Sequence, residues 1–144
     1  MRKCSDILLV GKLPSHHGDF VEALKTDAGC IEIHHVSNCQ EARAFLWASP
    51  RQRKTGCPNL ILLAPASEKK QVPLTLLKDL KAHAELRRIP VVVFVQKSET
   101  SEIGQYYRLY ANCCVEMPVE PERFKRMIDA IRFFWLNIVE LPSE

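Results

Sequence analysis

Two short stretches of the chain hold the residues best suited to acid–base or metal chemistry. The string SHHGDF, residues 15–20, places His16, His17 and Asp19 shortly after the first apolar run. The string CIEIHHVSNC, residues 30–39, brings two cysteines and two histidines close together. Histidine acts as a general base or a metal ligand only with a nucleophile or further ligands beside it. The first stretch is therefore a candidate for catalysis and the second for zinc binding.

Strand geometry argues against zinc at the second stretch. We predict a strand over residues 30–36, and successive side chains of a strand point to opposite faces of its sheet. His34 and His35 would then be unable to share one tetrahedral site with Cys30 and Cys39. The pair Cys113 and Cys114 alternates in the same way in a later predicted strand. Free buried thiols explain these cysteines more simply, and we expect no metal and no other cofactor.

Composition excludes several classes of protein. The chain has 144 residues and a net charge of +3, which is too near balance to indicate a nucleic-acid partner. The basic string RQRK, residues 51–54, lies between Pro50 and Gly56 and is predicted as a solvated loop, with nucleic-acid binding as its alternative role. No apolar run approaches the length of a membrane span. Six cysteines without a secretory signal favour a reducing compartment, and we expect the cytoplasm.

The elements that position these residues alternate regularly along the chain. Five β-rich runs cover residues 7–10, 30–36, 59–63, 89–95 and 112–116. Five helices are predicted between and after these runs. Three of them cover about 18–27, about 72–85 and 120–137, and the other two begin after the N-cap Asn38 and after an N-cap at Ser98 or Thr100. Strands that alternate with helices imply right-handed crossovers and a parallel sheet. The sequence therefore predicts one α/β domain over residues 1–144, a (βα)5 doubly wound sandwich, with a C-terminal extension of the last helix from about 134.

The last three predicted helices have apolar stripes that face a core. The third stripe consists of Leu76, Leu77, Leu80 and Ala84, the fourth of Ile103, Tyr106, Leu109 and Tyr110, and the fifth of Phe124, Met127, Ile128, Ile131 and Trp135. Tyr107 is off the fourth stripe, and Phe133, Phe134, Leu136 and Ile138 extend the fifth beyond what one core needs. Large exposed aromatic side chains mark interaction surfaces.

With this order of elements, the sequence resembles a response-regulator receiver domain over nearly its full length. The strings ILLV (7–10), PNLILL (58–63), IPVVVFV (89–95) and ANCCVEMPV (111–119) are similar to the first, third, fourth and fifth strands of that family. The tail FFWLNIVELP, residues 133–142, is similar to that of stand-alone receivers paired with bacteriophytochrome-type kinases. The resemblance implies a flavodoxin- or CheY-like sheet with strand order 2-1-3-4-5.

The resemblance also implies where a phosphorylation site would lie. In active receivers, two acidic residues after the first strand and an aspartate at the end of the third bind Mg²⁺, and that aspartate accepts the phosphoryl group. In this chain the two acidic positions are Gly11 and Lys12, and the acceptor position is Ala64. None of these three side chains offers an oxygen ligand, and the charge of Lys12 would repel a metal ion.

Three further positions of the implied site also depart from the family pattern. The hydroxyl position after the fourth strand is Val95, and the lysine position after the fifth strand is Met117. The aromatic residue that usually switches on the fifth strand is replaced by Cys114. Ser67, Glu68 and Glu116 lie nearby, but none has a partner acid for Mg²⁺. We therefore expect a degenerate pseudo-receiver that is not an enzyme.

Two functions of different classes follow from this sequence. The first is a phosphorylation-independent signalling protein of the two-component type that binds protein partners, such as a sensor kinase or another receiver, and forms a homodimer through its fourth helix, fifth strand, fifth helix and tail. Its expected surface consists of Ile103, Tyr106, Tyr107, Tyr110, Phe134 and Trp135. The alternative is a ligand sensor or enzyme with a repurposed pocket at the carboxyl edge of the sheet, built from Lys12, His16, His17, Asp19 and Glu116. No glycine-rich phosphate loop or G-x-S-x-G motif favours an enzyme.

Overall fold

A computed structural model of the chain describes residues 5–11, 31–48, 58–64, 69–95, 102–116, 120–131 and 133. Five strands within these residues form one parallel sheet with the order β2-β1-β3-β4-β5. The strands are β1 (Ser5–Gly11), β2 (Ile31–Val36), β3 (Leu60–Ala64), β4 (Val91–Val95) and β5 (Cys113–Glu116). The predicted fold class and strand order are confirmed.

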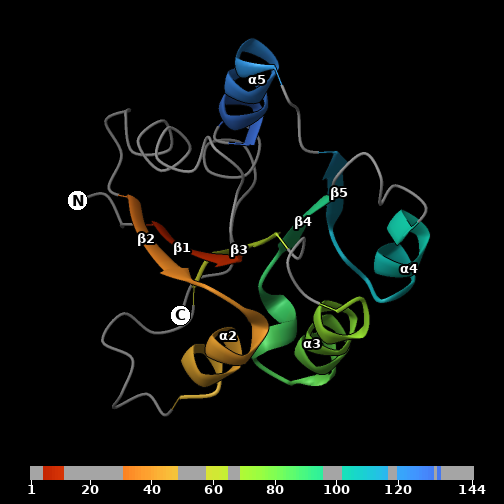
Figure 1. Ribbon diagram of the computed structural model, residues 1–144. Helices are drawn as coiled ribbons and strands as arrows, with labels where there is room; N and C mark the ends of the chain where they lie inside the picture. Colours follow the sequence, from red (N-terminus) through yellow and green to blue (C-terminus); the bar gives the residue numbers. More distant parts are fainter. Residues whose placement is uncertain are drawn as a thin grey trace.

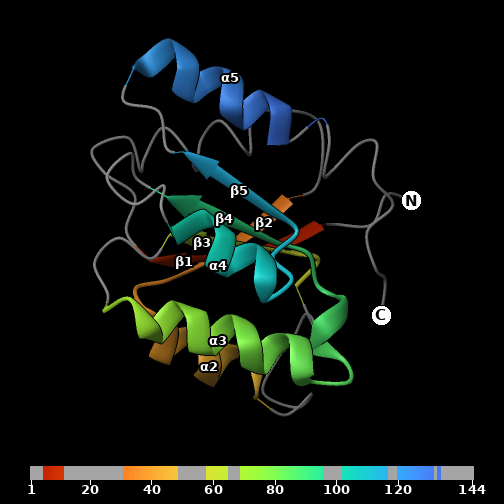
Figure 2. The same ribbon diagram turned by 90° about the vertical axis from the view of Figure 1, so that its right-hand side faces the viewer.

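The described helices cover both faces of the sheet. They are α2 (Cys39–Leu46), α3 (Gln71–Ala82), α4 (Ile103–Arg108) and α5 (Pro121–Ile131), with a short 3₁₀ helix, η1 (Leu86–Arg88), after α3. Figures 1 and 2 show α2, α3 and α4 on one side of the sheet and α5 on the other. None of the helices in this described part is long and apolar enough to cross a membrane. The helix predicted over 18–27 lies outside the described residues.

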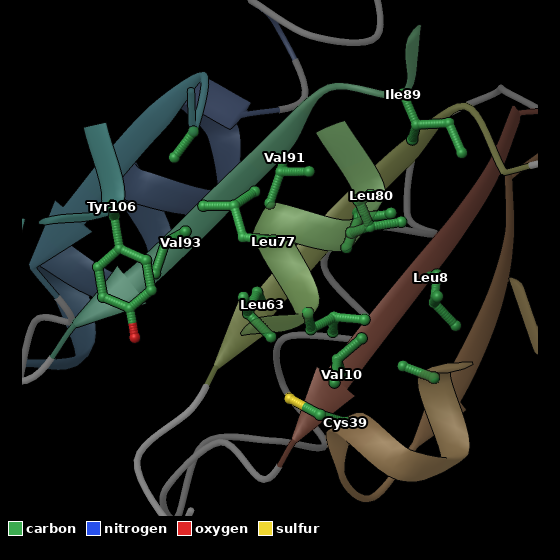
Figure 3. Close-up of a cluster of buried hydrophobic side chains, with 14 of the residues drawn as sticks. Leu8, Val10, Cys39, Leu63, Leu77, Leu80, Ile89, Val91, Val93 and Tyr106 are labelled. Carbon is green, nitrogen blue, oxygen red and sulfur yellow. The ribbon is translucent and has the colours of Figure 1, made fainter. Parts of the chain in front are cut away.

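The core is split into two clusters because each central strand is buried on both faces. Leu8 and Val10 of β1 pack with α2, α3 and α4, while Ile7 and Leu9 pack with α5 on the opposite face. All four side chains are fully buried. Figure 3 shows the first cluster, in which residues of β1, β3 and β4 meet side chains from the helices. This double burial explains the continuously apolar strands, since a parallel sheet leaves no face to solvent.

The predicted N-cap of α2 is confirmed. The side chain of Asn38 accepts a hydrogen bond of 2.8 Å from the backbone N–H of Glu41. The Glu41 carboxylate in turn accepts a bond of 2.7 Å from the N–H of Ser37. The two side chains thus satisfy one backbone donor inside the first turn and one just before the helix.

Helix α3 ends earlier than predicted. It stops at Ala82, and His83 adopts an extended conformation instead of continuing the helix. The Nδ1 atom of His83 accepts hydrogen bonds of 3.1 Å from the N–H groups of both Glu85 and Leu86. Ala84 is consequently exposed and not part of the apolar stripe, so that part of the prediction was wrong.

Helix α4 also ends before its predicted stripe does. Tyr110 has a φ of +69° and follows the helix as its left-handed cap residue. The N–H of Tyr110 donates to the Tyr107 carbonyl, and the N–H of Ala111 donates to the Tyr106 carbonyl. This pair of bonds is the Schellman arrangement, in which glycine usually holds the left-handed position. Tyr110 is 74% exposed, so its expected place in the core stripe was wrong.

Two asparagines bind neighbouring strands at the amino edge of the sheet. Asn59 donates its N–H to the Asp6 carbonyl at 2.7 Å, and its side-chain oxygen accepts from the Asp6 N–H at 2.8 Å. Asn112 makes the same pair of bonds to Val91, each 2.9 Å long. Each asparagine precedes a strand and aligns it with its neighbour, β3 with β1 and β5 with β4. Sequence reasoning missed both, although an Asn directly before an apolar run occurs twice.

The apolar face of α5 is confirmed over its described length. Phe124, Met127, Ile128 and Ile131 are buried against the sheet. Phe133, just beyond the helix, is 61% exposed. The predicted C-terminal extension from about 134 lies outside the described residues. Helix α4 begins at Ile103 with Glu102 as its N-cap residue, so the expected N-cap at Ser98 or Thr100 was wrong.

Candidate functional site at the carboxyl edge of the sheet

The ends of four strands meet at the carboxyl edge of the sheet. Gly11 of β1 and Ala64 of β3 are ladder partners, and Val95 of β4 is the ladder partner of Glu116 of β5. In open α/β proteins this edge carries the functional site. The structure therefore brings together Gly11, Ala64 and Val95, three of the predicted site positions. Lys12 and Met117 follow these strands directly but lie outside the described residues.

The backbone at Gly11 leaves no room for a side chain. Its φ is +101°, a conformation that residues with a Cβ rarely adopt. A Cβ added there would overlap the carbonyl oxygen of Ala64 on the neighbouring strand. The Nε2 atom of His35 on β2 donates to the Gly11 carbonyl oxygen at 2.7 Å and holds this peptide in place. An acidic side chain at position 11 is thus incompatible with this backbone.

The other two positions at this edge belong to the apolar core. Ala64 is 5% exposed and packs in the cluster under α5, while Val95 is 1% exposed and packs in the cluster under α2, α3 and α4. Of the five strand ends that the structure describes, only that of β5 carries a carboxylate, the exposed Glu116. Burial of a methyl and an isopropyl group here involves no unpaired charge.

These residues do not fit the magnesium site of an active receiver. A magnesium ion binds through carboxylate and carbonyl oxygens and water. The side chains of Gly11, Ala64 and Val95 supply no oxygen, and the Gly11 carbonyl is already bound by His35. Across the described part of the chain, no group of three or more His, Cys, Asp or Glu side chains is arranged to hold a metal ion.

The two histidines of β2 lie on opposite faces of the sheet, as predicted. Their ladder partners are Leu8 and Leu9, which belong to the two different core clusters. The Nε2 atom of His34 lies 3.5 Å from a carboxylate oxygen of Asp6, and its ring packs 5.3 Å from that of Phe45. His34 therefore contacts Asp6 near the amino end of β1, and its ladder partner Leu8 lies three residues before Gly11. Cys30, His16, His17 and Asp19 lie outside the described residues.

Cys114 is a half-buried thiol on the edge strand. Burial, with a smaller contribution from the neighbouring Cys113, raises the pKa of its thiol from 9.0 to about 11. Its backbone N–H donates to the hydroxyl oxygen of Tyr107 at 3.0 Å. The outer edge of β5 is thereby covered by an aromatic ring of α4, and the thiol itself is not ionised near neutral pH.

The expected interaction surface is partly exposed. Figure 2 looks onto this face, with β5 between α4 and α5. Tyr107 is 46% exposed and Tyr110 is 74% exposed, whereas Ile103 is partly buried against the core. Tyr106 is only 2% exposed and lies beside Val93 in the core (Figure 3), so its assignment to the surface was wrong. Phe134 and Trp135 lie outside the described residues.

Comparison with known proteins shows similarity to response regulators. No family model matches the chain. The sequence is 30% identical to the response regulator Rcp1 of Synechocystis sp. over 125 residues, which cover 85% of this chain and 82% of that protein. The fold is similar to that of the phosphorylated cyanobacterial phytochrome response regulator RcpA, with a TM-score of 0.86, 28% identity and coverage of 98% and 100% of the two chains.

A second solved structure agrees with the first. The Mn²⁺-bound form of Rcp1 has a TM-score of 0.84 and 29% identity, with 96% of this chain and 99% of that chain covered. The bacteriophytochrome response regulator RtBRR has a TM-score of 0.68 and 28% identity, with 98% and 86% covered. The likeness extends over nearly the whole chain in each case.

Proposed function

This chain belongs to the response-regulator receiver family, and on that basis we propose that it is a signalling protein that works without accepting a phosphoryl group. The observation that carries the proposal is the close contact between Gly11 and Ala64. The implied acidic position has no side chain and no space for one, and the implied acceptor is a buried methyl group. Among the described strand ends, Gly11, Ala64 and Val95 supply neither a nucleophile for phosphoryl transfer nor a carboxylate to bind Mg²⁺, and Glu116 is the single carboxylate there.

Two related structures hold groups that this chain is not expected to bind. One is of a phosphorylated regulator and one is of a Mn²⁺-bound regulator, so both relatives hold a group that this edge does not fit. The scaffold of this chain is nevertheless retained, with the same sheet order and a tightly packed core. We propose that the retained scaffold presents a binding surface to protein partners of a phytochrome-type pathway, and that the protein is not an enzyme.

The proposed surface lies over α4, β5 and α5 and includes a homodimer contact. Tyr110 supports this choice most directly, because it combines a left-handed backbone with a ring that is 74% exposed. A bulky residue in that conformation costs about 1 kcal/mol relative to glycine. Folding alone would favour glycine at this cap. A contact of the exposed ring with a second molecule would explain why tyrosine stands there instead.

A Tyr110→Gly variant separates folding from binding. We expect its free energy of unfolding to rise by about 1 kcal/mol because the strain at the cap is removed. We also expect its homodimer to dissociate with a Kd at least about tenfold higher, because the exposed ring is lost. Sedimentation velocity and urea unfolding measure the two effects.

Trp47→Ala is the matched control, since Trp47 is 41% exposed but follows α2, away from the proposed surface. Its dimer Kd should stay at the wild-type value. The wild-type Kd should also be the same with and without acetyl phosphate and Mg²⁺. A protein that sediments only as a monomer at about tens of micromolar would remove the homodimer from the proposal.

A further inference from the structure

A groove between α3 and α4 has no role in the proposed function so far. It has a volume of about 450 Å³ and is open to solvent. Figures 1 and 2 show the two helices side by side on the same side of the sheet. The described residues that line it are Gln71, Leu74, Thr75 and Lys78 of α3, with Gln105, Arg108 and Leu109 of α4 and its C-cap.

Both charged side chains that line the groove are positive. Lys78 comes from one wall and Arg108 from the other, and both side chains are exposed. Among the residues that the structure describes, no carboxylate lies within ion-pair distance of either. The nearby carboxylates are already engaged, since Asp79 pairs with Arg43 at 2.8 Å and Glu102 pairs with Lys70 at 3.6 Å.

The remaining lining combines hydrogen-bond donors with an apolar base. Gln71, Gln105 and Thr75 add neutral side-chain donors to the two cations, and these can also bind carboxylates. Leu74 is 8% exposed and Leu109 is partly buried, so the base of the groove offers a small apolar contact. Two cations, three neutral donors and an apolar base complement a segment that carries acidic side chains around an apolar one.

The shape of the groove favours a peptide over a small molecule. Pockets for small ligands are concave and enclose most of the ligand surface. This groove runs open between two helices, and its charges stand on opposite walls. A chain that lies along the groove would contact both walls, whereas an isolated small anion would remain largely solvated.

We propose that the α3–α4 groove binds an acidic segment of a partner protein, with Lys78 and Arg108 as the residues that recognise its carboxylates. The inference rests on the proposed function in one respect, namely that the chain acts by binding proteins. It adds a second surface on the side of α4 that faces α3, next to Tyr110, and it gives the chemistry of the partner that this surface selects.

Fluorescence anisotropy with a labelled, glutamate-rich peptide that carries one leucine tests the proposal. In the double variant Lys78→Glu with Arg108→Glu, we expect the Kd for this peptide to rise at least about tenfold. The control is Lys125→Glu with Arg126→Glu on α5, which exchanges the same residue types at exposed positions on the other side of the sheet. Its Kd should change less than about twofold once added salt screens the net charge.

Three outcomes would overturn the proposal. In the first, the wild type does not bind the peptide. In the second, both double variants lose affinity equally. In the third, inorganic pyrophosphate binds the wild type and displaces the peptide, and the groove variant no longer binds pyrophosphate. The last would identify a small-anion site. Far-ultraviolet circular dichroism verifies the folding of both variants, and Lys78→Gln with Arg108→Gln gives a milder pair with a smaller expected loss.

The groove and the proposed function fail separately. If acetyl phosphate phosphorylates the protein, the phosphorylation-independent mechanism is wrong and the peptide affinity is unaffected. If the peptide does not bind, the groove has no such partner and the unphosphorylated homodimer is unaffected.

Discussion

Gly11 is the residue at which sequence and geometry agree most closely. Its place at the end of β1 follows from the apolar run before it, and its lack of a side chain is plain in the sequence. The structure adds its φ of +101° and the approach of the Ala64 carbonyl. Neither is visible from residue types, because both depend on the register between β1 and β3.

A Gly11→Ala substitution should therefore destabilise the protein. We expect a loss of about 2–4 kcal/mol in the free energy of unfolding, from backbone strain and from overlap with the Ala64 carbonyl. Urea unfolding measures the loss. The control is Gly104→Ala in α4, where the nearest atom to the added Cβ is the Arg108 side chain at 4.0 Å. That change should stabilise the helix by about 0.5 kcal/mol, and equal effects of the two changes would contradict the account of Gly11.

Cys114 gives a second prediction at the residue scale. With its pKa raised to about 11, the thiol ionises far less at pH 8 than an ordinary cysteine with a pKa of 9.0. Iodoacetamide should therefore alkylate it about 100-fold more slowly than in the denatured chain, since the thiolate is the reactive form. Tandem mass spectrometry of the peptide distinguishes Cys114 from Cys113. A rate equal to that in denaturant would show that burial does not control this thiol.

At the scale of the elements, the strands were easier to predict than the helix ends. A strand buried on both faces must be apolar throughout, so every predicted strand lies within two residues of its observed bounds. Helices α3 and α4 end through local hydrogen bonds at His83 and Tyr110, and apolar periodicity does not report such bonds. Tyr106 was assigned both to the apolar stripe of α4 and to the surface, and only the assignment to the stripe is correct.

The junction at the start of β4 depends on Asn112. Its side-chain oxygen accepts from the Val91 N–H at 2.9 Å and from the Lys81 ammonium at 3.2 Å. The same ammonium donates to the carbonyls of Arg87 and Ile89, and its burial lowers the pKa of Lys81. One asparagine thus connects α3, β4 and β5.

An Asn112→Ala substitution should cost about 1–3 kcal/mol, because it leaves the buried Val91 N–H without an acceptor. The urea midpoint should fall with an unchanged m-value. In Asn112→Asp the oxygen is kept beside Lys81, so the loss should be clearly smaller. A loss of the same size in both variants would mean that the lost acceptor is not the cause.

At the scale of the whole molecule, the chain keeps the fold of the receiver family, while its described strand ends lack the acidic side chains that the family pattern implies. The parallel sheet, its two-sided core and the covering helices follow from the apolar patterning of the sequence, whereas the strand order was implied by the family resemblance. The resemblance located the implied site, but it could not show that the Ala64 carbonyl leaves no room for a side chain at Gly11. The α3–α4 groove was not predicted at all, because its lining comes from two helices far apart in the sequence that pack beside each other on one face of the sheet.

The central claim is that this receiver does not accept a phosphoryl group. Intact-protein mass spectrometry after incubation with acetyl phosphate and Mg²⁺ tests it most directly, with a receiver that has the full acidic site treated in parallel. We predict no mass increase for this chain while the parallel receiver gains one phosphoryl group. A gain of one phosphoryl group by this chain, stable enough to be mapped to a side chain, would contradict the account.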